Sequence, residues 1–413
     1  MDQITSSARK ITITLFAAQS LASAGFIAVA TLNSILAARL GGGASWAGVP
    51  SAVYLLGSAG AAFLWGYLMD LLGRRGGLTL GLVIGAAGTV LAFQAIAMNS
   101  MPVFLGGMVL MGMANAAVTL GRFAAAEVNP PNARGKAISN VVLGGAVGAI
   151  AGPLLVGPTG KLALAQGFDE LSGAYAASGV LFLLACLVVF ARLRPDPRDL
   201  GKEVARLYPE TNADSRPTRS LSQIIRQPEV IVAMMSMVLG QMVMVMVMVI
   251  TALHMRGHDH GLGAVSLVIS SHTFGMFGFS VFSGRLADRW GRGPVIIAGA
   301  ATLLLACITA PLSPDVLPLA VSLFFLGLGW NFCFVGGSTL LADQLSPAER
   351  ARTQGFNDLL VGLASAIASL SSGLIFASLG FTVMALAGAV FAIAPLAATL
   401  LWSRSRQRAA STV

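Results

Sequence analysis

Apolar stretches of about 20 residues recur along the whole chain, and each is long enough to cross the hydrocarbon core of a bilayer as a helix. Short polar breaks rich in Gly, Pro and charged residues separate them. The pattern predicts an all-α membrane fold with twelve transmembrane helices, at residues 11–38, 46–69, 77–97, 101–126, 135–158, 171–193, 229–253, 263–286, 293–312, 315–342, 350–378 and 380–402.

The longest polar break separates the sixth predicted helix from the seventh and contains several prolines and most of the loop charge. We therefore predict an N-terminal six-helix half at 1–193, a cytoplasmic linker at 194–227 and a C-terminal six-helix half at 228–413.

Composition and charge agree with a polytopic membrane protein. Only 10% of the 413 residues are charged, against about 25% in a typical soluble domain. All Lys and Arg residues except Arg39, Lys161 and Arg256 fall on the side of the two termini, which places both termini in the cytoplasm under the positive-inside rule. The net charge of +9 therefore indicates contact with membrane lipid and no nucleic-acid partner. We find no paired carboxylates, nucleophile–base set or phosphate loop, so we do not expect an enzyme.

The two halves repeat one pattern of Gly, Asp and Arg. Residues 66–75 recur at 284–292 with an offset of 218, and Asn115 and Glu127 recur as Asn331 and Asp343 with an offset of 216. This spacing indicates duplicated six-helix units. An Asp beside Arg at a helix end can form an ion pair that opens and closes as a two-state gate. The predicted inner gate comprises Asp70, Arg74, Arg75, Glu127, Arg134, Asp288 and Arg292.

Methionine and histidine concentrate in the seventh and eighth predicted helices. Met244 with Met248, and His272 with Met276, are i, i+4 pairs that each lie on one helix face. Met244 and His272 each lie about nine residues from the outer end of their helix, which is roughly 14 Å below the outer surface at the helical rise and near the midplane where transporter sites occur. Thioether sulfur and imidazole favour Cu(I). The alternative is that these methionines only fill an apolar core.

Other ionisable residues are candidates for metal capture or proton transfer. His254, His258 and His260 lie at the outer end of the seventh helix, where they could gather metal or form a solvated turn. Asp358 lies inside the eleventh predicted helix and is a candidate proton site, because ionisable residues within a membrane mark functional sites. Asn33, Asn115, Asn140, Trp330 and Asn331 could line a cavity or bond between helices.

The sequence G-x-L-x-D-x-x-G-R-R at residues 66–75 resembles the signature loop of the major facilitator superfamily. Twelve helices, a central linker and the duplication extend the resemblance over the whole chain, although Gly293 replaces the last basic residue in the second copy. The glycines at 144, 148 and 152, followed by Pro153, partly resemble the antiporter motif of proton-coupled drug exporters in this superfamily, without its later glycine pair.

Met-x3-Met followed by His-x3-Met resembles the CcoA-like bacterial copper importers. The resemblance implies a bacterial inner-membrane transporter that imports copper by alternating access, with copper as substrate and no cofactor. It implies cytoplasmic copper-handling proteins and haem–copper oxidase assembly as partners. The ligands that it implies are Met244, Met248, His272 and Met276. One alternative is a proton-coupled transporter of a small organic solute such as riboflavin. Another is a copper sensor or assembly factor that does not transport.

Overall fold

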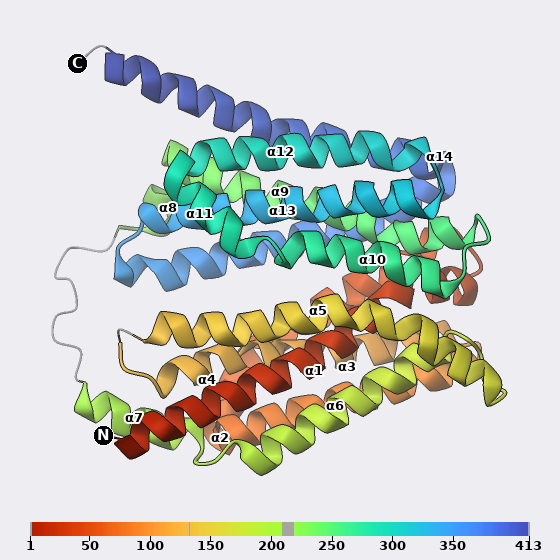
Figure 1. Ribbon diagram of the computed structural model, residues 1–413, viewed down its shortest axis with the longest axis horizontal. Coiled ribbons are helices and arrows are strands. Elements are labelled where there is room, and N and C mark those ends of the chain that lie inside the picture. The colour runs from red at the N-terminus through yellow and green to blue at the C-terminus, as the bar shows by residue number, and fades with distance from the viewer. Residues whose placement is uncertain (1, 132, 209–218, 412–413) are drawn as a thin grey trace. The chain divides into compact units, whose positions relative to one another are not determined.

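The computed structural model describes residues 2–131, 133–208 and 219–411, which form helices and connecting turns without a β-strand (Figure 1). The chain divides into two compact units. The first contains Met1–Gly43, Val49–Thr211 and Gly261–Ser266, and the second contains Ala44–Gly48, Asn212–His260 and Leu267–Val413.

The helices of the first half are α1 (Asp2–Leu40), α2 (Val49–Ala97), α3 (Met101–Thr119), α4 (Gly121–Glu127), α5 (Arg134–Ala165), α6 (Ser172–Arg192) and α7 (Pro197–Leu207), with the short η1 (Ala44–Trp46) before α2. The second half contains α8 (Leu221–Ile224), α9 (Pro228–Arg256), α10 (Leu262–Phe277), α11 (Ser280–Trp290), α12 (Arg292–Thr309), η2 (Ala310–Leu312), α13 (Val316–Asp343) and α14 (Pro347–Ser411).

Ten helical segments in the described part of the chain are long and apolar enough to cross a membrane. Two of them, Ala44–Ala97 over η1 and α2 and Arg352–Ser405 within α14, are 54 residues long and therefore too long for a single crossing. Each contains one glycine with positive φ, Gly73 at 79° and Gly380 at 80°, where the chain turns back. Glycine adopts this conformation without the steric cost that a side chain would bring. With these two helices divided, the segments correspond to the twelve predicted helices, and the all-α prediction is confirmed.

Two predicted helices are interrupted. The fourth, predicted at 101–126, divides into α3 and α4 at Leu120. The eighth, predicted at 263–286, divides into α10 and α11, with Gly278 and Phe279 between them. Apolar periodicity continues across such a break, so the sequence pattern does not reveal it.

The predicted linker is also partly helical. Helix α7 buries Leu200 and Val204, as an amphipathic helix on a protein surface does. Its charged residues are exposed except Arg198, which is half-buried. The predicted linker at 194–227 therefore contains α7 and α8, which the sequence analysis did not predict, and its residues 209–218 lie outside the described part of the chain.

The glycine stripe of α5 is a helix-packing surface. Helix α1 lies alongside α5 and α6 (Figure 1). A Cβ atom at Gly148 would overlap the carbonyl oxygen of Ser20, and one at Gly152 would lie 2.5 Å from that of Ala24. The stripe therefore lets α5 approach the backbone of α1, which is the ordinary role of small residues between membrane helices.

Candidate functional site: a charged gate and an aromatic–amide cluster

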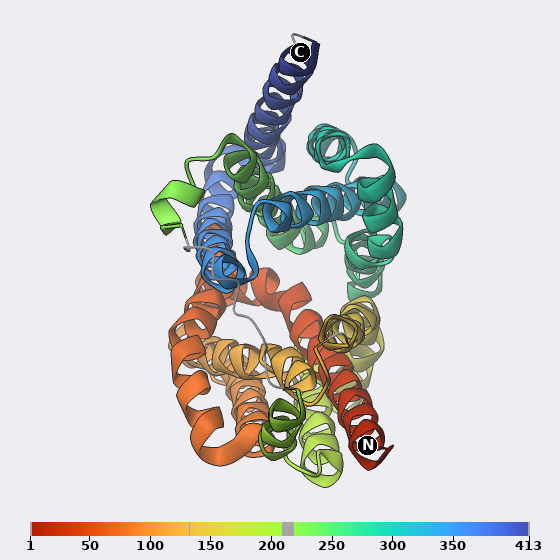
Figure 2. The ribbon, with the colours of Figure 1, turned by 90° about the vertical axis from the view of Figure 1, so that its left-hand side faces the viewer.

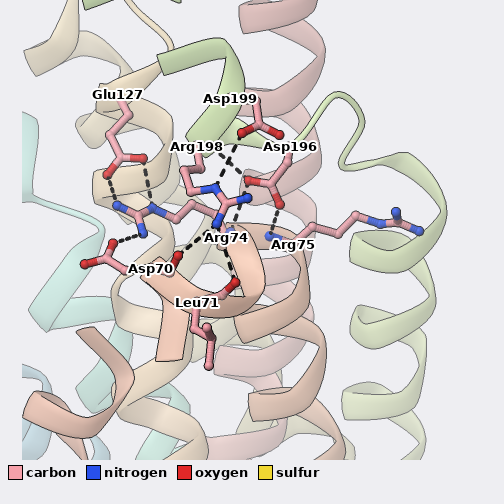
Figure 3. Close-up of polar contacts among 8 residues, drawn as sticks. All are labelled: Asp70, Leu71, Arg74, Arg75, Glu127, Asp196, Arg198 and Asp199. Carbon is pink, nitrogen blue, oxygen red and sulfur yellow. Dashed lines mark hydrogen bonds and ion pairs between the residues drawn. The ribbon is translucent and has the colours of Figure 1, made fainter. Parts of the chain in front are cut away.

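Arg74 is the centre of a charged network in the first unit (Figure 3). Its Nη1 donates to Asp70 Oδ1 at 2.6 Å, and its Nε and Nη2 donate to the two oxygens of Glu127 at 3.0 and 2.8 Å. The paired contact with Glu127 uses the planar fork of the guanidinium group. Arg74 lies directly after the turn at Gly73, and Glu127 is the last residue of α4. The network therefore joins the second segment of α2 to the end of α4.

The predicted gate residues Arg75 and Arg134 have different surroundings. Arg75 points away from Glu127 (Figure 3), donates from Nε to the Phe190 carbonyl at 3.0 Å, and holds its guanidinium 4.6 Å from the centre of the Phe190 ring. Arg75 therefore binds α6. Arg134 lines a cavity of about 660 Å³ together with Asp70, Arg74, Glu127 and Arg198.

Asp196 is a further member of this network that the sequence analysis missed. Its carboxylate accepts from the backbone N–H groups of Arg74 and Arg75 at 3.1 and 3.0 Å, and from that of Arg198 at 2.9 Å. It therefore caps both the second segment of α2 and helix α7. A side chain at Gly73 would collide with it, because a Cβ atom there would lie 2.5 Å from Asp196 Oδ2. Asp followed by Pro is a recognisable start of a helix, so the cap on α7 had a sequence signal.

The second unit repeats the Arg74 network. Arg292 Nη1 donates to Asp288 Oδ1 at 3.2 Å, and Nε donates to Asp343 Oδ2 at 3.0 Å. The three residues correspond to Arg74, Asp70 and Glu127 by the offsets of the sequence repeat. Asp343, which the predicted gate omitted, occupies the position of Glu127. The two halves therefore share the same ion-pair partners, although Arg292 contacts Asp343 through Nε alone, whereas Arg74 contacts Glu127 through both Nε and Nη2.

His272 is completely buried on α10, with an exposed fraction of 0%. Its Nδ1 lies 3.0 Å from the Leu323 carbonyl oxygen of α13, and its Nε2 has no hydrogen-bond partner within residues 2–411 as described. Met244 is 6% exposed, while Met248 and Met276 are half-buried. The structure also places the Met276 carbonyl against Asn331 Nδ2, at 2.6 Å.

Of the three outer histidines, His254 and His258 contact each other, with ring centres 4.5 Å apart. His254 stacks on Phe381 with ring centres 4.0 Å apart, and its carbonyl lies 3.0 Å from His258 Nδ1. His260 Nε2 instead lies 2.9 Å from the carbonyl oxygen of Pro314, in the loop between η2 and α13. In the described residues no group of three or more His, Cys, Asp or Glu side chains is placed to hold a metal ion.

Asp358 differs from its sequence interpretation. Its side chain is exposed on α14, whereas the preceding Asn357 is completely buried and donates to Met237 Sδ at 3.7 Å. The interpretation placed Asp358 deep in the protein because its helix is apolar. The face that a helix buries depends on its neighbours, and here Asn357 occupies that face.

Four half-buried residues of the second unit form an aromatic–amide cluster: Gln241, Phe277, Trp330 and Phe334. Trp330 Nε1 donates to Gln241 Oε1 at 2.6 Å. The Trp330 ring stacks on Phe334 with centres 5.0 Å apart and an angle of 17°, and it meets Phe277 edge-on at 6.1 Å. The cluster forms because α13 packs against α9 (Figures 1 and 2). It combines flat apolar surface with a polar amide.

Asn331, which follows Trp330, bridges the break between α10 and α11. Its Nδ2 donates to the Met276 carbonyl and to Ser280 Oγ, at 2.6 and 3.0 Å, and its Oδ1 accepts from Ser283 Oγ. These bonds satisfy groups that the helix break releases. The corresponding residue of the first half, Asn115, donates instead to Ser58 Oγ at 3.4 Å. The equivalent asparagines of the two halves therefore make different contacts.

Comparison with known proteins places these features in a family. The sequence model of the Major Facilitator Superfamily matches residues 15–263 and 244–412. An uncharacterized MFS-type transporter of Bacillus subtilis (strain 168), YdeG, is 35% identical over 390 residues, which cover 94% of this chain and 90% of that protein. The riboflavin transporter RfnT of Brucella anthropi is 31% identical over 374 residues, with 91% of each chain covered.

Solved structures show the same fold. The nucleoside transporter NupG superposes with a TM-score of 0.72 at 15% identity, covering 95% of this chain and 98% of that chain. A bacterial homologue of the human lysosomal transporter Spinster, in an inward-facing and occupied conformation, has a TM-score of 0.72 at 16% identity and covers 95% and 96%.

Proposed function

Because the chain belongs to the Major Facilitator Superfamily, we propose that this multi-pass membrane transporter carries a small, planar organic solute of the riboflavin class. This assignment replaces copper import as the leading hypothesis. The similarity to RfnT over 91% of the chain supports it. The placement of Lys and Arg supports an orientation with both termini in the cytoplasm of a bacterial inner membrane.

The aromatic–amide cluster is the structural observation that carries the proposal. A conjugated ring system binds by stacking on flat aromatic side chains, while one or two polar groups fix its orientation. Trp330 and Phe334 supply the flat surface, and Gln241 supplies the amide. The amide nitrogen of Gln241 has no hydrogen-bond partner in the described part of the chain, so it remains a donor for a carbonyl group of the solute.

We expect the Trp330→Ala variant to raise the KM for riboflavin roughly 5- to 150-fold, because stacking of a planar base on an aromatic ring contributes about 1–3 kcal/mol. Uptake of radiolabelled riboflavin by a riboflavin auxotroph, at matched protein levels, measures this change. The Phe282→Ala variant is the control, since Phe282 is 55% exposed on α11 and outside the cluster. Failure of the wild-type protein to carry riboflavin would exclude this solute. Equal KM values in the two variants would exclude the aromatic–amide cluster as its binding site.

Copper remains a second candidate because of one observation. His272 Nδ1 faces the Leu323 carbonyl, which leaves Nε2 as a buried acceptor. A metal-binding histidine is commonly held in this way, with its other ring nitrogen bonded to a carbonyl group. Met244, Met248 and Met276 would supply the sulfur ligands that favour Cu(I).

Cu(I) binding to the purified protein tests this candidate. If the site exists, the wild-type protein binds one Cu(I), and His272→Ala and Met244→Ala each weaken binding at least tenfold. Met242→Ala is the control, because Met242 lies about 160° from Met244 around α9. Equal Cu(I) binding in all three variants, or none in the wild-type protein, would remove copper as a candidate.

A further inference from the structure

The cavity beside Arg74 is formed by helices of the first unit, and we name it the linker cavity because α7 belongs to the predicted linker. Its volume of about 660 Å³ lies within the range of small-molecule binding sites. Helix α2, helix α4, the start of α5 and one face of α7 each contribute to its wall. The charged residues that line it are Asp70, Arg74, Glu127, Arg134, Arg198 and Lys202.

Positive charge exceeds negative charge in the linker cavity, because four cationic side chains and two carboxylates line it. Arg74 already binds both carboxylates, at 2.6 Å to Asp70 and at 2.8 and 3.0 Å to Glu127. Arg198 Nη1 donates to the carbonyl oxygen of Asp70 at 2.8 Å, which fixes its side chain against the same turn (Figure 3). The carboxylates are therefore engaged within the wall, and the excess of positive charge favours an anionic ligand.

Lys202 is a cationic residue of the cavity that lies outside the gate network. It is exposed on α7 and forms no hydrogen bond or ion pair with the described residues of the chain. Its ammonium group therefore keeps three donors for a ligand. Arg134 lines the same cavity and begins α5, whose N-cap residue Ala133 offers no capping side chain. A helix N-terminus without a cap attracts anions, so Lys202 and the start of α5 act in the same direction.

Phe123 adds a flat apolar surface to this charged wall. It lines the cavity from α4 and is 46% exposed. Donors that reach the cavity from α5 and α7 suit a phosphate group, because its oxygens point in several directions, whereas the two oxygens of a carboxylate lie in one plane. An aromatic ring beside these donors suits an apolar part attached to the phosphate.

We propose that the linker cavity binds an organic phosphate from the cytoplasmic side, with the phosphate among the cationic side chains and the organic part against Phe123. Two sources present this chemistry there: a soluble phosphate ester and the headgroup of an anionic phospholipid. The bound phosphate joins α7 to α4 and α5 around the Arg74 network. Because a ligand stabilises the conformation that it binds, it holds this network closed and slows transport.

Binding of phenyl phosphate to the protein purified in a neutral detergent tests the proposal without reference to the transported solute. Isothermal titration calorimetry should show one site in the wild-type protein, and Lys202→Gln should weaken binding about tenfold, because it removes a charge-assisted contact. Arg206→Gln is the matched control: Arg206 lies one turn further along α7, is exposed and does not line the cavity. No binding to the wild-type protein in either this assay or the lipid assay below, or equal weakening in the two variants, would overturn the proposal.

Phe123→Leu separates the two parts of the ligand. This variant keeps an apolar side chain but removes the ring, so it should weaken binding of phenyl phosphate and leave binding of inorganic phosphate unchanged. Equal affinity of Phe123→Leu and the wild-type protein for phenyl phosphate would remove Phe123 from the site.

The lipid source is distinguished by melting temperatures in nanodiscs of phosphatidylcholine with and without phosphatidylglycerol, since a bound ligand raises the melting temperature. Stabilisation by phosphatidylglycerol that is lost in Lys202→Gln and kept in Arg206→Gln, without binding of phenyl phosphate, assigns the phosphate to a lipid headgroup. Binding of phenyl phosphate with the same dependence on Lys202 assigns it to a soluble ester.

The effect on the gate is measured as riboflavin transport in inside-out membrane vesicles, whose accessible face is the cytoplasmic one, and this measurement rests on the proposed function. The identified phosphate ligand should lower the initial rate at least about twofold in the wild-type protein and in Arg206→Gln, but not in Lys202→Gln. Binding without a change of rate would overturn the control of the gate. Failure of the wild-type protein to carry riboflavin would overturn the solute assignment alone, because the binding assays do not use riboflavin.

Discussion

The Arg74→Ala variant is expected to lose at least nine-tenths of the transport rate while its affinity for solute changes little. Arg74 makes three hydrogen bonds to the carboxylates of Asp70 and Glu127, and its side chain is 19% exposed. Hydrogen bonds to charged groups contribute about 1.5–3 kcal/mol, so removal of the guanidinium shifts the gate equilibrium roughly 10- to 150-fold. Initial rates and KM values in proteoliposomes measure both quantities.

Two variants at the same turn are matched controls. Arg75→Ala removes an equal charge but only the contacts with Phe190 of α6, so a smaller loss of rate is expected. Asp70→Asn should reduce the rate only a few-fold, because Asp70 is 73% exposed and an exposed ion pair contributes about 0.2–1 kcal/mol. Equal losses in Arg74→Ala and Arg75→Ala would show that charge alone, and not the bridge to Glu127, determines the effect.

The Glu349→Gln variant is expected to lower the thermal stability of the protein in a pH-dependent way. Glu349 is 2% exposed near the start of α14. Its carboxylate accepts from the backbone N–H, Nε and Nη2 of Arg219 at 2.8–2.9 Å, and from the Ser346 N–H at 3.0 Å. These bonds hold Arg219, which lies within the predicted linker, against α14. Gln keeps the size of the side chain but lacks the charge and one of the two acceptor oxygens.

The sign of the pH dependence follows from the same contacts. The Arg219 guanidinium, followed by the Ser346 N–H, lowers the pKa of Glu349 below its ordinary range. A carboxyl group whose pKa is lowered by folding adds stability above its unfolded pKa of about 4.3. That contribution is lost as the pH falls from there through the lower pKa of the folded state.

Melting temperatures of the detergent-purified protein between pH 8 and pH 3 measure this effect. The difference between wild type and Glu349→Gln should be constant from pH 8 to about pH 5 and should shrink below about pH 4. Glu203→Gln is the control, because Glu203 is exposed on α7. A difference that grows on acidification would contradict the assigned role of the Arg219 contact.

The copper hypothesis shows what the spacing of a short motif can and cannot predict. The i, i+4 spacing correctly places Met244 with Met248, and His272 with Met276, on one face of each helix, but spacing does not show which face meets another helix. The structure places His272 against Leu323 and puts Asn331 on the Met276 backbone. The similarity to RfnT extends over 91% of the chain, whereas the motif of soft ligands comprises four residues, so the similarity is the stronger basis for a proposal.

The sequence by itself determined the features that depend on local spacing. Apolar length located the twelve crossings, with breaks predicted at 70–76 and at 379, next to the turns that the structure shows at Gly73 and Gly380. The i, i+4 spacing joined Asp70 to Arg74 and Asp288 to Arg292. Tertiary structure decided every contact between distant segments, because these depend on which helix faces meet. It brought Glu127 to Arg74 across 53 residues and Asp196 to the same turn across 122. It buried Asn357 in place of Asp358, and it joined Gln241 to Trp330, because the environment of a side chain is set by the helices packed around it.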